Sequence, residues 1–167
     1  MTDNNTSREQ LWELIKDIKF AMFITRHENG HLHARPMTTQ NRSVDQDDRL
    51  WFFMSRSDST LADLGNGAEV NLSYADTDHH QYVSVSGTAR PVEDLVKVRS
   101  LWSKAAEIWF PGGAGDPDLA LVEVQITHSH YWNTSDNKIT QLYKFAKAVV
   151  TGESPKQMGD SVEVRTQ

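Results

Sequence analysis

The residues of this chain that could take part in chemistry are concentrated between positions 31 and 64. An alternating segment around Arg35 and Pro36 is followed by an aromatic segment at 50–54 and then by the hydroxyl-rich segment 57–60. Proline cannot donate to a sheet, so the strand around it leaves backbone groups unpaired. Hydroxyl and N–H groups at a helix start suit an anion. Together, these segments supply what a flat, phosphorylated cofactor needs.

Arg35 is the sharpest candidate for a ligand contact. On an alternating strand, its side chain lies on the same side as His31, His33 and Met37. Its guanidinium group is always charged and can bind a phosphate. The alternative is an arginine that is simply solvated at the surface.

Metal and nucleophile chemistry are less well supported. The chain has no cysteine, which excludes a thiolate nucleophile and a disulfide framework. His31 with His33, and His128 with His130, have a spacing that places both imidazoles on one strand face. No cysteine or acidic third ligand follows them at a recognised spacing. We therefore expect no metal site, and the catalytic residues stay unknown.

Composition limits the classes of protein and partner. A chain of 167 residues with 38% hydrophobic and 24% charged residues fits one domain, expected at 1–152, with a polar and disordered tail at 153–167. The net charge of −6 repels phosphate backbones, so no nucleic-acid partner is expected. The first ten residues lack the pattern of a secretion signal, and no segment approaches the roughly 20 apolar residues of a membrane span. We expect a cytoplasmic protein without a membrane partner.

Hydrophobic patterning predicts the elements that must position the site. Strands are expected at 20–26, 31–39, 50–54, 70–74, 80–92 and 119–132, and helices at about 6–18, 57–64, 95–108 and 139–150. Asn29 and Gly30 favour a hairpin turn, and Gly87 indicates a bulge or bend inside the longest strand. Short links between strands predict an α+β protein with a small antiparallel barrel. No glycine-rich phosphate loop follows a strand, so we expect no Rossmann domain.

Six stretches, in the same order, carry a resemblance to a known family. They are HARPM at 33–37, LWFF at 50–53, VNLSYAD at 70–76, YVSVSGTA at 82–89, WFPGG at 109–113 and YW at 131–132. From about residue 11 to about residue 152, the chain resembles the bacterial general stress proteins of the pyridoxamine 5′-phosphate oxidase-like, FMN-binding split-barrel superfamily. The resemblance implies a six-stranded antiparallel split β-barrel of Greek-key type with flanking helices. It also implies a homodimer with one FMN in each of two clefts between the subunits.

The resemblance assigns cofactor contacts residue by residue. The arginine that matches Arg35 faces the flavin in the related oxidases, and the backbone beside Pro36 can pair with the polar edge of the ring. The expected cofactor-binding residues are Arg35, Pro36, Met37, Thr38, Phe52, Phe53, Met54, Ser57, Ser59, Thr60, Tyr82, Trp109 and Trp132. Other roles stay open for some of them: core packing for the aromatic strand, helix capping for the hydroxyls, and interface packing for the tryptophans.

The chain departs from the family pattern at the phosphate end. Many relatives place a lysine or arginine where this chain has Ser59 and Thr60, and that cation pairs with the flavin phosphate. Charge-assisted hydrogen bonds are roughly twice as strong as neutral ones. Unless Arg35 or Arg56 replaces the cation, we expect weaker or less phosphate-dependent binding, which leaves FAD and riboflavin as further cofactors beside FMN.

Two functions remain open at this stage. The first is an oxidoreductase that uses bound FMN on an unknown substrate. The second is a non-catalytic flavin-binding module for stress response or redox sensing. Pyridoxamine phosphate oxidase activity is not expected, because that enzyme family ends in a substrate segment with arginine and histidine, whereas residues 152–167 contain only Arg165.

Overall fold

The computed structural model of the protein describes residues 3–43, 47–133 and 160–165. The strands are β1 Phe20–Arg26, β2 Leu32–Thr38, β3 Arg49–Ser55, β4 Ala68–Asp76, β5 Gln81–Val92, β6 Leu119–Asn133 and β7 Asp160–Arg165. The helices are α1 Asp3–Ile15, α2 Ser59–Leu64 and α3 Leu95–Leu101, with short 3-10 turns η1 Ala106–Ile108 and η2 Gly113–Gly115. None of these described helices is long and apolar enough to span a membrane.

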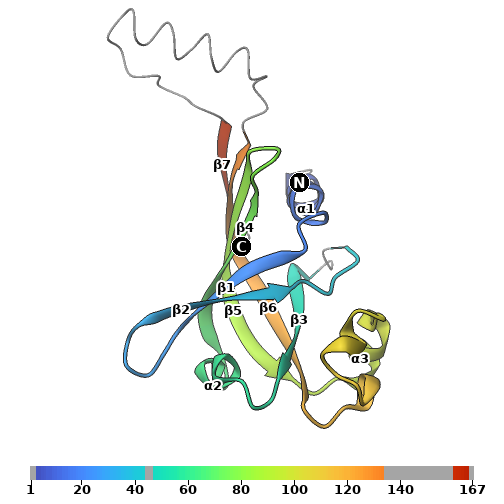
Figure 1. Cartoon of the computed structure of the whole chain (residues 1–167). Helices are drawn as coiled ribbons and strands as arrows, with labels where there is room; N and C mark the ends of the chain where they lie inside the picture. Colours follow the sequence, from blue (N-terminus) through green and yellow to red (C-terminus); the bar gives the residue numbers. More distant parts are fainter. Residues whose placement is uncertain (1–2, 44–46, 134–159, 166–167) are drawn as a thin grey trace, which may run out of the picture.

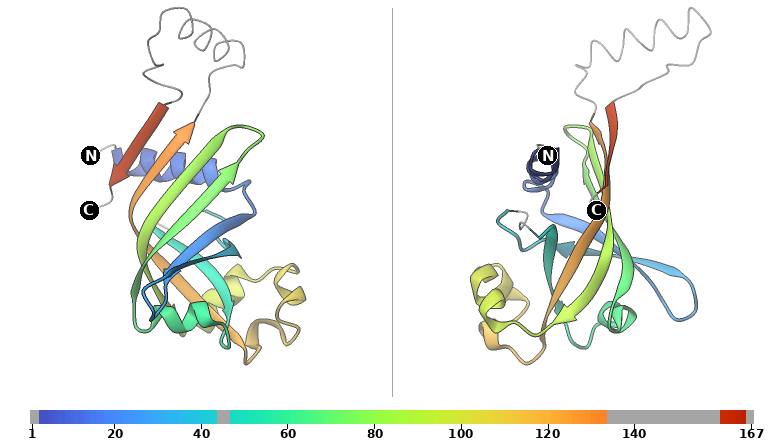
Figure 2. Two further views of the ribbon diagram at one scale, coloured as in Figure 1. Left: turned by 60° about the vertical axis from the view of Figure 1, so that its left-hand side comes forward. Right: turned by 180° about the vertical axis from the view of Figure 1, so that it is seen from behind.

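The strands form one antiparallel sheet that curls into a half-barrel (Figure 1, Figure 2). Their order is β2-β1-β4-β5-β6-β3, and β7 pairs with β6. The edge strands β2 and β3 approach each other at a single bridge between Thr39 and Phe52, next to a hydrogen bond of 2.8 Å from the Gln40 N–H to the Trp51 carbonyl oxygen. The predicted six-stranded split barrel in an α+β protein is thus confirmed, with β7 as an addition.

The inside of the curl holds the main core. Alternate residues of β4 face inward, as its pattern of buried and half-buried residues shows, and β-strand geometry requires this alternation. Phe23 and Phe52 are fully buried, and their rings meet edge to face with centroids 5.2 Å apart. Leu11 and Ile15 of α1 and Leu64 of α2 complete this core.

A second, smaller core lies on the opposite face of β3 and β6. Here Trp51 and Phe53 pack with Val98 and Leu101 of α3 and with Phe110 of the following loop. The helix α3 therefore covers the outside of the sheet next to β3 (Figure 2). Because the side chains of β3 alternate, this strand contributes to both cores.

The hairpin and the bulge occur where the sequence predicts them. β1 and β2 pair from Phe20 with Thr38 to Arg26 with Leu32, and Gly30 in the turn has a φ of 82°. The register between β5 and β6 shifts between Ser86 and Gly87. These predictions from local turn and glycine signals are confirmed.

Three expectations about elements need correction. The tail expected to be disordered at 153–167 instead contains β7, whose sequence DSVEVR alternates in the manner of a strand. The helix expected at 95–108 ends at Leu101, where Trp102 is extended (ψ 138°) and its ring packs near Phe53. The first helix ends at Ile15 instead of residue 18. The helix expected at 139–150 lies outside the described residues.

Candidate functional site

A pocket opens where the edge strands β2 and β3 diverge from their single bridge. Because Thr39 pairs with Phe52 in antiparallel register, residues 35–38 of one strand lie opposite residues 53–55 of the other. The pocket volume is ≈ 450 Å³, within the range of about 300–1,000 Å³ typical of small-molecule sites. It is lined by Phe20, Arg35, Pro36, Met37, Thr38, Gln40, Phe53, Met54, Ser55, Asp58, Ser103, Ala105, Ala106, Trp109 and Phe110.

The contact between the two edge strands is supported from inside the barrel. The hydroxyl groups of Thr39 and Tyr74 lie 2.7 Å apart. Burial raises the pKa of Tyr74 well above its ordinary value, so this hydroxyl stays protonated. This contact joins the end of β2 to β4 directly beside the pocket.

Arg35 of β2 forms an ion pair with Asp58 across the pocket. Asp58 is the N-cap residue of α2, and its Oδ1 accepts a hydrogen bond of 2.8 Å from the Thr60 N–H. The side chain of Arg35 is 47% exposed and that of Asp58 is 13% exposed. The guanidinium group therefore reaches the ligand space while a fixed carboxylate holds it.

One wall of the pocket is formed by β3, and only some residues of this strand belong to the pocket lining. Phe53 lines the pocket, whereas the ring of Phe52 points into the main core. Met54 also lines the pocket, although its side chain is almost completely buried. At the end of the strand, the Ser55 hydroxyl donates to Asp118 Oδ2 at 2.6 Å and lies 2.7 Å from the Ser57 hydroxyl.

The loop after α3 provides the third wall. Phe110 is buried in the smaller core and anchors this loop, whereas Trp109 is 76% exposed and lines the pocket. The next turn is held by a hydrogen bond of 2.8 Å from the Gly112 N–H to Asp116 Oδ2. A fixed backbone thus carries an exposed indole ring at the pocket.

The structure brings seven of the thirteen expected cofactor-binding residues together at this pocket. They are Arg35, Pro36, Met37, Thr38, Phe53, Met54 and Trp109.

The other six do not line the pocket. Phe52 is in the core, and Thr60 is buried with its N–H bound to Asp58. Ser57 and Ser59 lie at the start of α2, and Ser59 is exposed. Tyr82 and Trp132 face each other across β5 and β6 and are partly exposed. Within the described chain, these six residues therefore do not belong to the pocket lining.

Several lining residues were missed by the sequence analysis. Phe20 and Gln40 flank predicted strands but carry no motif of their own. Asp58 had a usable signal, because aspartate directly before a predicted helix is a preferred N-cap. It was overlooked because the neighbouring Ser57, Ser59 and Thr60 were considered as the phosphate donors instead.

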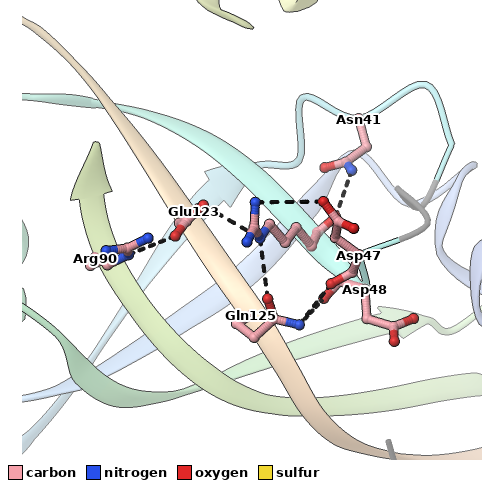
Figure 3. A network of polar contacts seen from close by, with 7 residues as sticks. Asn41, Asp47, Asp48, Arg90, Glu123 and Gln125 are labelled. Carbon is pink, nitrogen blue, oxygen red and sulfur yellow. Dashed lines mark hydrogen bonds and ion pairs between the residues drawn. The ribbon is translucent and has the colours of Figure 1, made fainter. Parts of the chain in front are cut away.

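A second polar cluster, away from the pocket, joins β3, β5 and β6 (Figure 3). Glu123 is buried and accepts a hydrogen bond of 2.6 Å from Arg90 Nε, and its other oxygen lies 3.5 Å from Arg49 Nε. The Gln125 side chain accepts from Arg49 and donates to the Asp47 carbonyl oxygen at 2.7 Å. The buried carboxylate is thus paired with two arginines, which links β3, β5 and β6. We assign this cluster to the scaffold.

The described residues contain no group of three or more histidine and acidic side chains able to hold a metal ion. The ring of His33 instead stacks on that of His27 at 4.0 Å, and His27 Nδ1 lies 2.5 Å from an oxygen of Asp63. These contacts tie the turn between β1 and β2 to α2.

Comparison with known proteins identifies the family. The sequence model described as "Pyridoxamine 5′-phosphate oxidase like" matches residues 6–156. The chain belongs to this family. The resemblance drawn from the six sequence stretches is therefore confirmed.

Several relatives of this pyridoxamine 5′-phosphate oxidase-like protein have been described. Protein bli-3 of Neurospora crassa is 28% identical over 147 residues, covering 81% of this chain and 68% of that protein. The crystal structure of the general stress FMN/FAD binding protein from Xanthomonas citri is 30% identical, with a TM-score of 0.67 and coverage of 80% of this chain and 93% of that one.

A more distant structure supports the fold. A protein from Clostridium acetobutylicum related to general stress protein 26 of B. subtilis is 22% identical, with a TM-score of 0.67, and covers 78% of this chain and 90% of that one.

Proposed function

We propose that the pocket between β2 and β3 binds FMN and that the protein is an FMN-dependent oxidoreductase. The observation that carries the proposal is the convergence of Arg35 and the adjoining residues 36–38 with Phe53 and Trp109 on one cavity of ≈ 450 Å³. The FMN/FAD binding of the relative from Xanthomonas citri supports the same cofactor class.

The lining residues fit a flat ring with one polar edge. No further strand in the described part of the chain pairs with the outer edges of β2 and β3, so backbone donors and acceptors face the diverging space. Phe53 offers an apolar wall, and Trp109 can cover the ring. Bound FMN would supply the exchange of hydride or electrons. The chain's own residues bind the ring, orient it and exclude water.

The proposal includes a homodimer that completes the site. Phe20 and Trp109 line the pocket and are exposed, and Met22, Tyr82 and Trp132 are exposed elsewhere on the sheet. Exposed apolar groups of this kind are typical of interaction surfaces. Light scattering should give the mass of two chains, with one flavin bound per chain. A monomer that holds a full equivalent of flavin at micromolar concentration would contradict the dimer.

Two measurements test the cofactor and the reaction. Purified protein should be titrated with FMN, FAD and riboflavin by calorimetry, and FMN should bind. The bound flavin should then bleach under anaerobic NADH or NADPH and recover its colour with an electron acceptor. Absence of binding would overturn the whole proposal. Binding without bleaching by either nicotinamide would leave a non-catalytic flavin-binding module. No oxidation of pyridoxamine phosphate is expected.

Replacement of Arg35 by alanine should weaken FMN binding by about ten- to a hundredfold, since a hydrogen bond to a charged group contributes about 1.5–3 kcal/mol. The variant also leaves Asp58 without its partner, so a negative charge then faces the ligand phosphate. Calorimetry with the purified variant gives the dissociation constant.

Arg56→Ala is the matched control. Arg56 binds Glu93 at 2.9 Å and does not line the pocket, so its removal should leave FMN affinity unchanged. If both variants lose affinity equally, the role assigned to Arg35 is wrong.

A further inference from the structure

The pocket carries one positive and one negative side chain, and they are paired. Among its lining residues, only Arg35 and Asp58 are ionisable at neutral pH, and they form an ion pair. The cation that a ligand phosphate would meet in this lining, Arg35, is therefore already paired with a carboxylate.

Asp58 is the fixed member of this pair. Its Oδ1 accepts the Thr60 N–H at 2.8 Å, which ties the carboxylate to the backbone of α2. Arg35 is about half exposed and extends from an edge strand. When a phosphate approaches Arg35, it must share the guanidinium group with a carboxylate that is bonded to the backbone of α2.

We infer that Asp58 is a specificity-determining residue, which lowers the preference of the pocket for phosphorylated flavins over unphosphorylated ones. This inference rests on the proposed function, because it concerns which flavin the same site selects.

Two effects act in the same direction. The carboxylate occupies donors of Arg35 that a phosphate would use, and it repels a group that carries a charge of about −1.5 to −2. Riboflavin has the same ring but no phosphate, so it encounters neither effect. The dissociation constants of FMN and riboflavin should therefore lie within about tenfold of each other, the effect of one charge-assisted hydrogen bond.

One further cation, Arg56, lies close to this pair in the sequence. Arg56 is bonded to both oxygens of Glu93, at 2.9 and 3.2 Å, and does not line the pocket. The hydroxyls of Ser55 and Ser57 bond each other, and Ser55 also donates to Asp118. The balance between FMN and riboflavin thus depends on Asp58.

Asp58→Asn tests the inference. Asparagine caps a helix about as well as aspartate, so α2 is kept while the negative charge is removed. Calorimetric titration of the full chain should show FMN affinity about tenfold higher than in the unmodified protein and riboflavin affinity unchanged. The gain should shrink at high salt, because screening weakens the contact between Arg35 and the phosphate.

The matched control is Asp94→Asn. Asp94 is the N-cap of α3, where it accepts the Lys97 N–H at 2.8 Å, and it does not line the pocket. Asp94→Asn removes one negative charge from an N-cap position, as Asp58→Asn does. FMN and riboflavin should therefore bind this variant as tightly as the unmodified protein. Asp58→Ser is the second test variant, because serine also caps a helix but is too short to keep the contact with Arg35.

The outcomes separate the inference from the function on which it rests. If neither flavin binds the unmodified protein, the proposed function fails. If both bind and the ratio of FMN to riboflavin affinity is the same in Asp58→Asn and Asp58→Ser as in the unmodified chain, the inference is wrong and the function stands. An unmodified protein that prefers FMN by a hundredfold or more would also overturn the inference, without use of a variant.

Discussion

Replacement of Phe52 by alanine should lower the free energy of unfolding by about 3–5 kcal/mol. The ring is fully buried and meets that of Phe23 edge to face, with centroids 5.2 Å apart. Its backbone also forms the single bridge to Thr39 that joins the two edge strands. Truncation would leave a cavity directly beneath the point where the barrel closes. Urea denaturation followed by tryptophan fluorescence measures the change.

Ile108→Ala is the matched control for this prediction. Ile108 is 79% exposed in η1, so its truncation should change the free energy of unfolding by less than about 0.5 kcal/mol. A loss below about 1 kcal/mol in Phe52→Ala would contradict the central position of the ring. Phe53, by contrast, packs in the smaller core and lines the pocket, so its ring does not contribute to the main core.

The sequence predicted β1 to β6 well because these strands carry local signals. The alternation in β4, the apolar run of β3 and the turn at Gly30 depend only on neighbouring residues. The helix expected at 95–108 failed for the opposite reason. Its helical pattern continues past Leu101, but the packing of Trp102 near Phe53 ends the helix there. Contacts between distant segments decided that boundary.

The site was predicted to the extent that its residues are close in sequence. Residues 35–38 and 53–54 lie on neighbouring strands in the chain, so a motif could find both groups. Phe20 comes from another strand and Ser103 from the loop after α3, and no spacing indicates that they meet. The partner of Arg35 is 23 residues away, so their ion pair depends on how α2 packs against β1 and β5 of the sheet.

The same limit applies to the start of α2, where the sequence predicted contacts with a phosphate. Local capping rules pointed to hydroxyl donors at 57–60, and the structure instead places a carboxylate against Arg35. A motif match depends on which residue types stand at which positions, and it contains no information about the contacts between them. Only the three-dimensional structure shows that the carboxylate of Asp58 pairs with Arg35, the cation that the motif assigns to the cofactor.

Gly87→Ala should destabilise the protein by about 3 kcal/mol, at the upper end of the cost of overpacking. A Cβ atom at this position would lie 2.3 Å from the carbonyl oxygen of Gln125 and 3.0 Å from a methyl carbon of Val124. The first of these contacts is with backbone, so relief requires β5 and β6 to move apart at the bulge. Thermal or urea unfolding of the variant measures the loss.

Gly115→Ala separates this clash from a general effect of alanine. A Cβ atom at Gly115 would meet nothing within 4 Å, and its φ is not in the left-handed region. Alanine there should leave the free energy of unfolding within about 1 kcal/mol of its original value, or raise it, because the unfolded chain loses freedom. If the free energy of unfolding falls by less than about 1 kcal/mol in Gly87→Ala as well, the bulge tolerates a side chain. A large loss at Gly87 alone would instead identify the bulge as the place where β5 and β6 must approach most closely. Because β3 pairs with β6 from Arg49 to Ser55, a shift of β6 would also move one wall of the pocket.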